Sequence, residues 1–148
     1  MMLVTHLSFA LLAGLAITKY IDFSANSYLF VVFVLLASVI PDVDCSDSVI
    51  GRRFRLLSVF VKHRGFFHSI TFAVALAIIV FLITQNSYYA FAIIIGFSSH
   101  IILDSFTRAG TSPFWPGKLR IKGKLRTGRL VDGVLFFVFL ISSVLMWI

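Results

Sequence analysis

The sequence predicts an all-α protein, a polytopic bundle in which about five helices cross a membrane. Of its 148 residues, 59% are hydrophobic and only 13% are charged, and the mean hydropathy is +1.02. Soluble domains carry charges on roughly a quarter of their residues, because they need a polar surface. The low charged fraction therefore indicates that most of the surface faces lipid. The length suits a single membrane-embedded domain over residues 1–148.

Five apolar stretches approach the length of a membrane span. The last three come close to the roughly 20 residues that a transmembrane helix needs, and the first two are shorter. The first stretch is similar to a signal peptide, but it lacks a basic start and carries His6 at its edge, so we expect it to be retained. The predicted spans are residues 7–21, 27–40, 66–83, 88–106 and 130–148.

Basic residues gather on one side of this arrangement. Twelve of the 13 Lys and Arg residues fall in the loops 41–65 and 107–129, which lie on the same side as the N-terminus, and only Lys19 lies near the other side. Cytoplasmic loops are rich in Lys and Arg. The sequence therefore predicts a protein of the plasma (inner) membrane, with a cytoplasmic N-terminus and the C-terminus outside.

The two basic loops also suggest partners. Residues 48–62 mix bulky apolar and basic residues, which is typical of an interfacial helix, and residues 118–129 suggest a short basic hairpin. Both would lie against anionic headgroups, so we expect membrane lipids as partners and no nucleic acid. The sequence carries no signal for an oligomeric state. The single Cys45 excludes a disulfide within the chain.

His100 and Asp104 form the most informative pair. They are four residues apart in an apolar stretch, so both project from one helix face. An ionisable residue inside a span costs about 2.5–3.5 kcal/mol, and it is by default a candidate for function. A divalent cation would offset this cost, because it favours carboxylate and neutral imidazole together. A His–Asp hydrogen bond that ties two helices together is the structural alternative.

Acidic residues follow the second span, in Pro41-Asp42-Val43-Asp44. The proline disfavours a helical conformation at Ile40, so we expect the helix to end there. The C-terminal end of a helix prefers cations, so Asp42 and Asp44 at this position favour a metal or an Arg partner over a solvated cap.

The third span opens with His63 and His68, which are five residues apart. A continuous helix would not bring them to one face, but a break between loop and helix can place His68 in the first turn and His63 beside it. Arg64 between them suits an anionic group such as phosphate. His6 before the first span and Asp132 at the start of the fifth are weak signals alone, but they lie at the same predicted membrane depth.

Taken together, these motifs resemble those of the YdjM-like membrane-bound metal-dependent hydrolases, and the likeness spans nearly the whole chain in order. The motifs that carry it are Thr5-His6, Pro41-Asp42-Val43-Asp44, His63-Arg64-Gly65-Phe66-Phe67-His68-Ser69, and Ser99-His100-Ile101-Ile102-Leu103-Asp104-Ser105 with Gly110 and Trp115-Pro116. A fainter likeness is to zinc-dependent phospholipase C. The resemblance implies a hydrolase, with His63 near a set of metal ligands formed by His6, Asp42, Asp44, His68, His100 and Asp104.

Three positions depart from the family pattern. Phe67 stands where Thr is common, Cys45 where His often follows the second Asp, and Asp132 where Glu is usual. These departures leave the number of metal ligands open. We expect the site to hold one to three divalent metals. Imidazole ligands favour zinc, and the equal share of carboxylates keeps manganese as the second choice.

The expected function is hydrolysis of a phosphate ester or phosphodiester of a membrane lipid at the cytoplasmic interface. We expect catalytic roles for Asp44 and His63, and Asp132 is a possible additional metal ligand. The expected substrate-binding residues are Arg64, Ser69 and Arg108. A non-catalytic membrane adaptor with a structural metal is the main alternative. A metal or proton transporter fits less well, because the outer halves of the last three spans are almost entirely apolar.

Overall fold

The computed structural model describes residues 2–21, 26–44 and 66–148. Within these residues the chain is helical, and apart from two isolated β-bridges they contain no strand. The predicted all-α bundle with five main helices is confirmed, whereas the predicted interfacial helix at 48–62 lies outside the described residues. The elements are α1 (Leu3–Tyr20), α2 (Ser27–Val39), η1 (Ile40–Asp44), η3 (Phe66–His68), α4 (Ile70–Thr84), α5 (Ser87–Phe106) and α6 (Arg129–Trp147).

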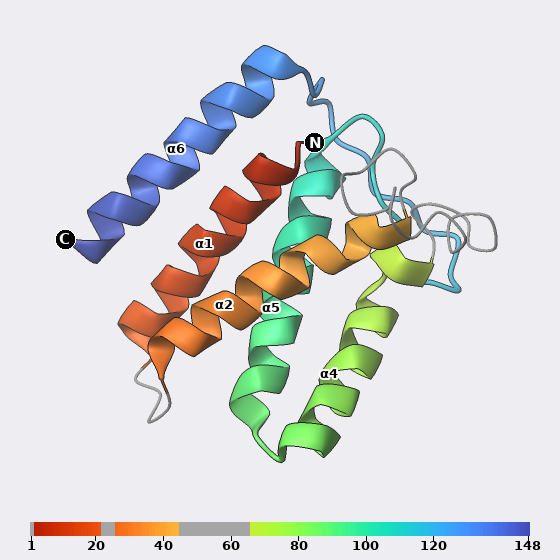
Figure 1. Ribbon diagram of the computed structural model, residues 1–148. Helices are drawn as coiled ribbons and strands as arrows, with labels where there is room; N and C mark the ends of the chain where they lie inside the picture. Colours follow the sequence, from red (N-terminus) through yellow and green to blue (C-terminus); the bar gives the residue numbers. More distant parts are fainter. Residues whose placement is uncertain (1, 22–25, 45–65) are drawn as a thin grey trace.

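Helix α5 is the centre of the bundle. It packs against α1, α2 and α4, whereas α6 lies along α1 at the outside of the bundle (Figure 1). Half of the α5 residues are buried, against 11% of α6. The core between α1, α2 and α5 is built from Ala10, Phe30, Val34, Tyr88 and Ala92.

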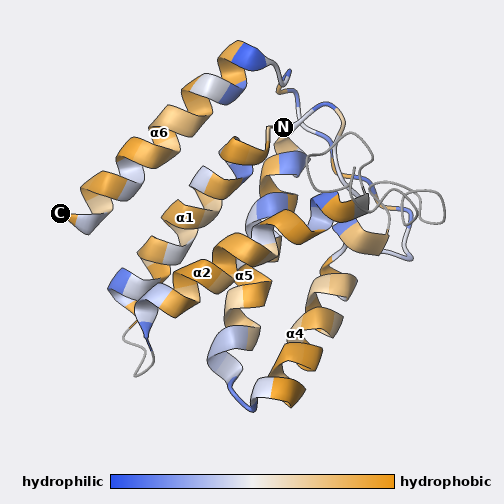
Figure 2. Cartoon of the chain, in the orientation of Figure 1, coloured by the Kyte–Doolittle hydropathy of each residue, from blue (hydrophilic) through white to orange (hydrophobic). Residues whose placement is uncertain are grey.

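The outward faces of the helices are strongly apolar. Large side chains such as Ile78, Val134 and Leu145 are more than 50% exposed, and hydrophobic residues cover most of each helix (Figure 2). Helices α1, α5 and α6 are long and apolar enough to cross a membrane. Helices α2 and α4 are shorter, with 13 and 15 residues. At 1.5 Å per residue, 15 residues extend about 22 Å, which is less than the roughly 30 Å of a hydrocarbon core.

Polar side chains define where three of the helices begin. The side chains of Asn26, Ser69 and Asn86 each accept a hydrogen bond from a backbone N–H in the first turn of α2, α4 and α5. Such N-caps satisfy N–H groups that the helix itself leaves without a partner. Gln85 ends α4 in the left-handed conformation, with φ of 51°.

Three local predictions are corrected. Helix α1 begins at Leu3, so His6 lies inside its first turn and does not precede it. His68 lies in η3, because Ser69 is the N-cap and α4 begins only at Ile70. Helix α2 ends at Val39 as predicted, but Ile40 keeps helical angles of −57° and −40° despite the following proline, and the chain continues as η1. Proline fits here because its fixed φ is compatible with the first turn of a helix.

The loop 107–128 joins α5 to α6 and differs from the predicted basic hairpin. The segment 118–129 does not pair with itself. Thr111 and Ile121 instead exchange two backbone hydrogen bonds of 2.9 Å, and Leu125 donates to the carbonyl of Phe106 at 3.0 Å. The basic segment therefore folds back on residues 106–111. The same loop holds the start of α4, since Ile70 N donates to Pro113 O at 2.8 Å.

Gly96 lies where α2 and α5 cross. A Cβ atom at this position would overlap the backbone carbonyl oxygen of Val34 and would lie 2.8 Å from the Cβ of Ala37. The backbones of the two helices are thus in direct contact, and only a residue without a side chain fits between them.

Gly96→Ala is expected to destabilise the protein by about 1–3 kcal/mol, because the added methyl group forces α2 and α5 apart. Thermal unfolding of the purified protein in detergent measures the effect. Gly133→Ala in α6 is the matched control, since nothing lies within 4 Å of its added Cβ, and it should not lower Tm, because Ala favours a helix more than Gly does. Equal stability of the Gly96→Ala variant and the wild type would contradict the close contact between α2 and α5.

Candidate metal centre

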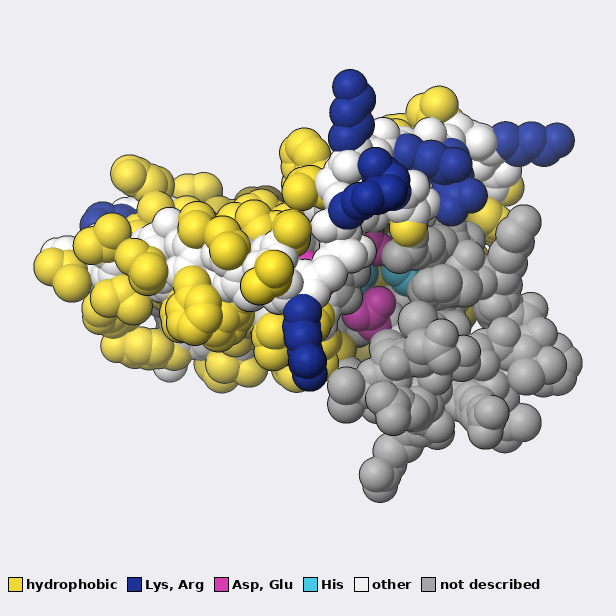
Figure 3. All heavy atoms as spheres, turned by 90° about the horizontal axis from the view of Figure 1, so that it is seen from above, with side chains coloured by type: hydrophobic (Ala, Val, Ile, Leu, Met, Phe, Trp, Pro, Cys, Tyr) yellow, Lys and Arg dark blue, Asp and Glu magenta, His cyan; other side chains and the backbone are white. Residues whose placement is uncertain are grey.

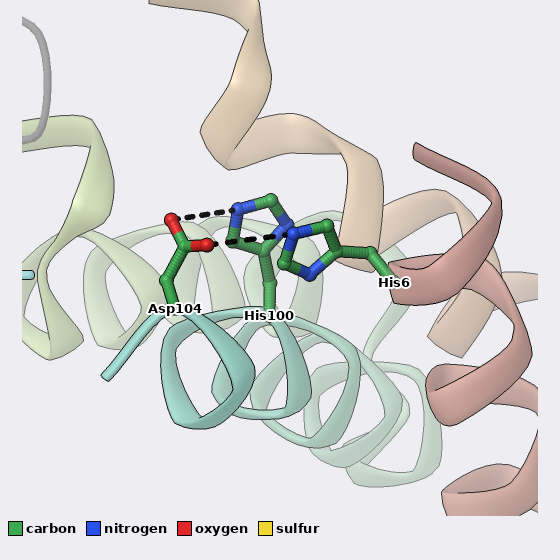
Figure 4. A group of neighbouring side chains, drawn as sticks. All are labelled: His6, His100 and Asp104. Atoms are coloured by element: carbon green, nitrogen blue, oxygen red, sulfur yellow. Dashed lines mark ion pairs between the residues drawn. The ribbon is translucent and has the colours of Figure 1, made fainter. Parts of the chain in front are cut away.

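Five of the six residues proposed as metal ligands come together at one end of the bundle. They come from four separate elements, and their ligand atoms form two groups within which all atoms lie less than 4.8 Å apart. His100 belongs to both groups. The first group is His6, His100 and Asp104 (Figure 4), and the second is Asp42, His68 and His100.

The distances between these atoms suit a shared cation better than direct hydrogen bonds. His6 Nε2 lies 3.5 Å from Asp104 Oδ1, His68 Nε2 lies 3.9 Å from Asp104 Oδ2, and His100 Nε2 lies 3.8 Å from Asp104 Oδ2. An N–H···O hydrogen bond spans roughly 2.7–3.2 Å. Ligand atoms around zinc, each about 2.0–2.1 Å from the ion, are about 3.4 Å apart at tetrahedral angles. The observed separations are close to this value.

The orientation of His100 is fixed by the carbonyl group of Ser38. His100 Nδ1 lies 2.7 Å from Ser38 O. A carbonyl oxygen only accepts, so Nδ1 carries the proton and Nε2 of the neutral ring presents a lone pair. Nε2 faces Asp104 and, at 3.7 Å, Oδ1 of Asp42, and it has no hydrogen-bond partner among the described residues. A cation between the lone pair and the two carboxylates would satisfy all three groups, and metal-ligating His residues are commonly oriented by such a carbonyl.

The three imidazole rings are packed on one another. The rings of His6 and His100 are stacked, with centroids 3.8 Å apart and planes inclined by only 9°. The ring of His68 meets that of His100 edge-on, at 5.4 Å and 74°. All three His side chains are at most 1% exposed. The packing brings the three rings together at one end of the bundle, where they can serve as nitrogen donors.

Asp42 is the most accessible member of the cluster. It lies in η1, beyond the last residue of α2, and its side chain is 18% exposed, compared with 3% for Asp104. Burial raises the pKa of the Asp42 carboxyl above its ordinary value. A nearby cation opposes that effect, because it favours the charged carboxylate. The cluster therefore opens toward solvent at Asp42.

The position of His68 depends on the loop 107–128. Thr111 Oγ1 donates to the backbone carbonyl of His68 at 3.4 Å, and Thr71 Oγ1 donates to Trp115 O at 2.7 Å. The ring of Trp115 packs edge-on against Phe66 at 4.8 Å. The loop thus holds η3 against the end of α5, which carries Asp104.

Other predicted site residues have different surroundings. The Ser69 hydroxyl donates to Phe66 O at 2.6 Å and caps α4, so its only proton is used within the fold. Arg108 is exposed. Asp132 is 3% exposed and belongs to neither group of donors; its backbone carbonyl accepts a hydrogen bond from Thr5 Oγ1 at 3.3 Å. The side chain of Asp44, together with His63 and Arg64, lies outside the described residues.

Sequence reasoning missed Ser38 and Gly96. Gly96 was detectable in principle, because Gly96, His100 and Asp104 follow at intervals of four and share one face of α5. A small residue on the face that carries functional side chains indicates a close helix contact. The carbonyl of Ser38 gives no sequence signal, since every residue has one.

A divalent cation fits the described donors. The two groups together contain three imidazoles and two carboxylates, in surroundings where an uncompensated buried charge is costly. Nitrogen and oxygen donors of this kind suit zinc and manganese, and the described cluster contains no thiolate or thioether that would favour copper(I).

The chain is similar in sequence to known bacterial proteins. Over 91 residues the chain is 32% identical to the uncharacterized protein YvsG of Bacillus subtilis (strain 168), a match that covers 59% of this chain and 57% of YvsG. Over 97 residues it is 30% identical to the inner membrane protein YdjM of Escherichia coli (strain K12), covering 60% of this chain and 50% of that protein. The protein of the same name from Shigella flexneri matches equally.

The chain thus spans about half the length of the curated relatives it matches. No solved structure matches it significantly. The family model described as YdjM inner membrane protein matches residues 1–148. This match covers the whole chain, including the residues of both donor groups. The chain therefore belongs to the YdjM family of inner membrane proteins.

Proposed function

We propose that this protein is a membrane-bound metal-dependent hydrolase that acts on a phosphate ester or phosphodiester of a membrane lipid. The observation that carries the proposal is the buried cluster of three His and two Asp, with N···O separations of 3.5–3.9 Å, at the end of an apolar bundle. A cluster at the end of a membrane-spanning bundle would lie near the lipid headgroups, so the substrate would not have to leave the bilayer.

The ligands in this proposal are His6, Asp42, His68, His100 and Asp104. Zinc is the favoured ion and manganese the second choice. A divalent ion held there supplies a water of lowered pKa and polarises the phosphate. The protein holds the imidazoles neutral and directs the lone pair of His100 through Ser38. Asp44 as a further ligand and His63 as a proton carrier remain part of the proposal from the sequence alone.

Basic side chains beside the cluster support a phosphate-bearing substrate. Viewed from the end that carries the cluster, Asp and His side chains are visible in a recess between other atoms, and Lys and Arg side chains gather next to it (Figure 3). Arg108, four residues after Asp104, is exposed and can pair with two phosphate oxygens. Ser69 is a weaker candidate, because phosphate oxygens only accept and its proton is donated to Phe66.

The membrane orientation follows from the same charges. All seven Lys and Arg residues from Arg108 to Arg129 are exposed at this end, whereas Lys19 lies near the other end. By the positive-inside rule we propose that the cluster faces the cytoplasm. Anionic headgroups of that leaflet would then lie next to the basic loop.

Removing a ligand should lower the metal content. His100→Ala is expected to weaken zinc binding by at least about 10-fold, because it deletes the donor shared by both groups. Elemental analysis of the purified protein measures the change. Asp132→Asn is the matched control, since Asp132 is buried but lies in neither group, and it should keep the wild-type content. A wild-type protein that binds no divalent metal would remove the chemical basis of the proposal.

Substrate binding should be separable from metal binding. Arg108→Ala is expected to keep its metal but to lower hydrolysis of an anionic phospholipid about 10- to 100-fold, since a charge-assisted contact is worth about 1.5–3 kcal/mol. Phosphate release from mixed vesicles provides the assay, and chelation should abolish it. Lys19→Ala, which removes a cation from the opposite end, is the control. If the chelated protein hydrolysed the lipid at the wild-type rate, the activity would belong to a contaminant, and the non-catalytic adaptor with a structural metal would be favoured.

The proposed orientation predicts the position of both termini. A reporter that works only in the cytoplasm should be active when it is fused to the N-terminus. A reporter that works only outside the cytoplasm should be active when it is fused to the C-terminus. The expectation for the C-terminus depends on an odd number of spans. A cytoplasmic C-terminus would show that one of the shorter helices, α2 or α4, does not cross the membrane.

A further inference from the structure

The stacked rings of His6 and His100 restrict how many ions the cluster can hold. The lone pair of an imidazole nitrogen lies in the plane of its ring, so a ligated metal lies in or near that plane. The two ring planes are inclined by only 9°, and their centroids are 3.8 Å apart. Planes that are nearly parallel and separated in this way have no common region close to both rings. One ion therefore cannot lie in both planes.

The ring of His68 has the opposite relation to His100. Their planes are inclined by 74°, so they intersect, and the two Nε2 atoms both face Oδ2 of Asp104, at 3.9 and 3.8 Å. Oδ1 of Asp42 lies 3.7 Å from Nε2 of His100. These four donors can therefore surround one ion.

The carboxylate of Asp104 connects this position to His6. Its Oδ2 faces His68 and His100, whereas its Oδ1 faces Nε2 of His6 at 3.5 Å (Figure 4). A carboxylate whose two oxygens face separate sets of nitrogen donors has the geometry of a bridging ligand. Metal pairs in phosphatases and nucleases are about 3.5–4 Å apart, which is comparable to the distance between the stacked rings.

We propose that the cluster holds two divalent cations bridged by Asp104, an inference that rests on the proposed function. The inner ion is held by Asp42, His68, His100 and Oδ2 of Asp104. The outer ion is held by His6 and Oδ1 of Asp104. Among the described residues the inner ion has four donors and the outer ion two.

The unequal numbers of donors suggest different roles for the two ions. With two ligands among the described residues, the outer ion would keep positions open, as a substrate-binding ion requires, whereas an ion with four is nearly closed. Two dications beside the two described carboxylates also leave net positive charge at the site. A phosphate diester or monoester supplies matching negative charge and can bridge the ions through its oxygens. The pair therefore deepens the proposed substrate class toward phosphoesters.

The test is a manganese titration of the full-length protein, purified in detergent and stripped of metal. Equilibrium dialysis with elemental analysis gives the stoichiometry, and electron paramagnetic resonance reports whether the ions are coupled. The wild type is expected to bind two equivalents, one tightly and one at least about 10-fold more weakly, as expected from the unequal donor sets. The fully loaded protein should give the spectrum of a spin-coupled pair.

Two variants assign the positions. His6→Ala should lose the weaker equivalent and keep the tighter one, with the spectrum of an isolated ion. His68→Ala should weaken the tighter equivalent. Asp132→Asn is the control for a buried carboxylate outside both donor groups, and it should still bind two equivalents with the coupled spectrum.

The possible failures are distinguishable. A single equivalent in the wild type, with the spectrum of an isolated ion at saturation, would overturn the two-ion site and leave a one-metal hydrolase in place. Complete loss of binding in a folded His6→Ala variant would overturn it as well, because all donors would then serve one centre. A wild type that binds no manganese or zinc would overturn both this inference and the proposed function.

Discussion

The direct contact between the backbones of α2 and α5, at Val34 and Gly96, determines how the cluster is arranged. One helical turn beyond this contact on each helix, Ser38 presents its carbonyl to Nδ1 of His100 at 2.7 Å. A further turn along α5 brings Asp104 beside the imidazoles. The directions of the donor atoms thus follow from the spacing of two helices. A wider crossing would break the Ser38 hydrogen bond and leave the His100 ring free to rotate.

A polar cluster at the end of an apolar bundle is expensive unless its charges are compensated. The carboxylate of Asp104 and three imidazoles are almost completely buried, beside helices whose other faces are apolar. The driving force for helix association is weak where lipid tails are as apolar as the side chains. In the proposed metal centre, four elements would contribute ligands to the bound ions and gain an attraction that apolar packing does not supply. Metal binding would then be thermodynamically coupled to the assembly of α1, α2 and α5.

Sequence patterns predicted much of this arrangement, with clear physical limits. Apolar stretches revealed the helices, and the four-residue spacing of His100 and Asp104 correctly implied a shared face. Local rules gave the wrong backbone conformation for Ile40 and His68, because tertiary contacts of η1 and of the loop 107–128 decide it. The stacking of His6 on His100 was not predictable, because it depends on how α1 and α5 meet across almost a hundred residues.

The position of α6 has a consequence for biogenesis. This helix packs along α1 and contributes none of the five donors, all of which precede it in the chain. During translation the last of these donors, Asp104, leaves the ribosome before the first residue of α6. The four preceding helices can thus bring the donors together while α6 is still being synthesised. Insertion of α6 would then cover one side of a cluster that is already assembled, so the formation of the cluster does not have to wait for this helix.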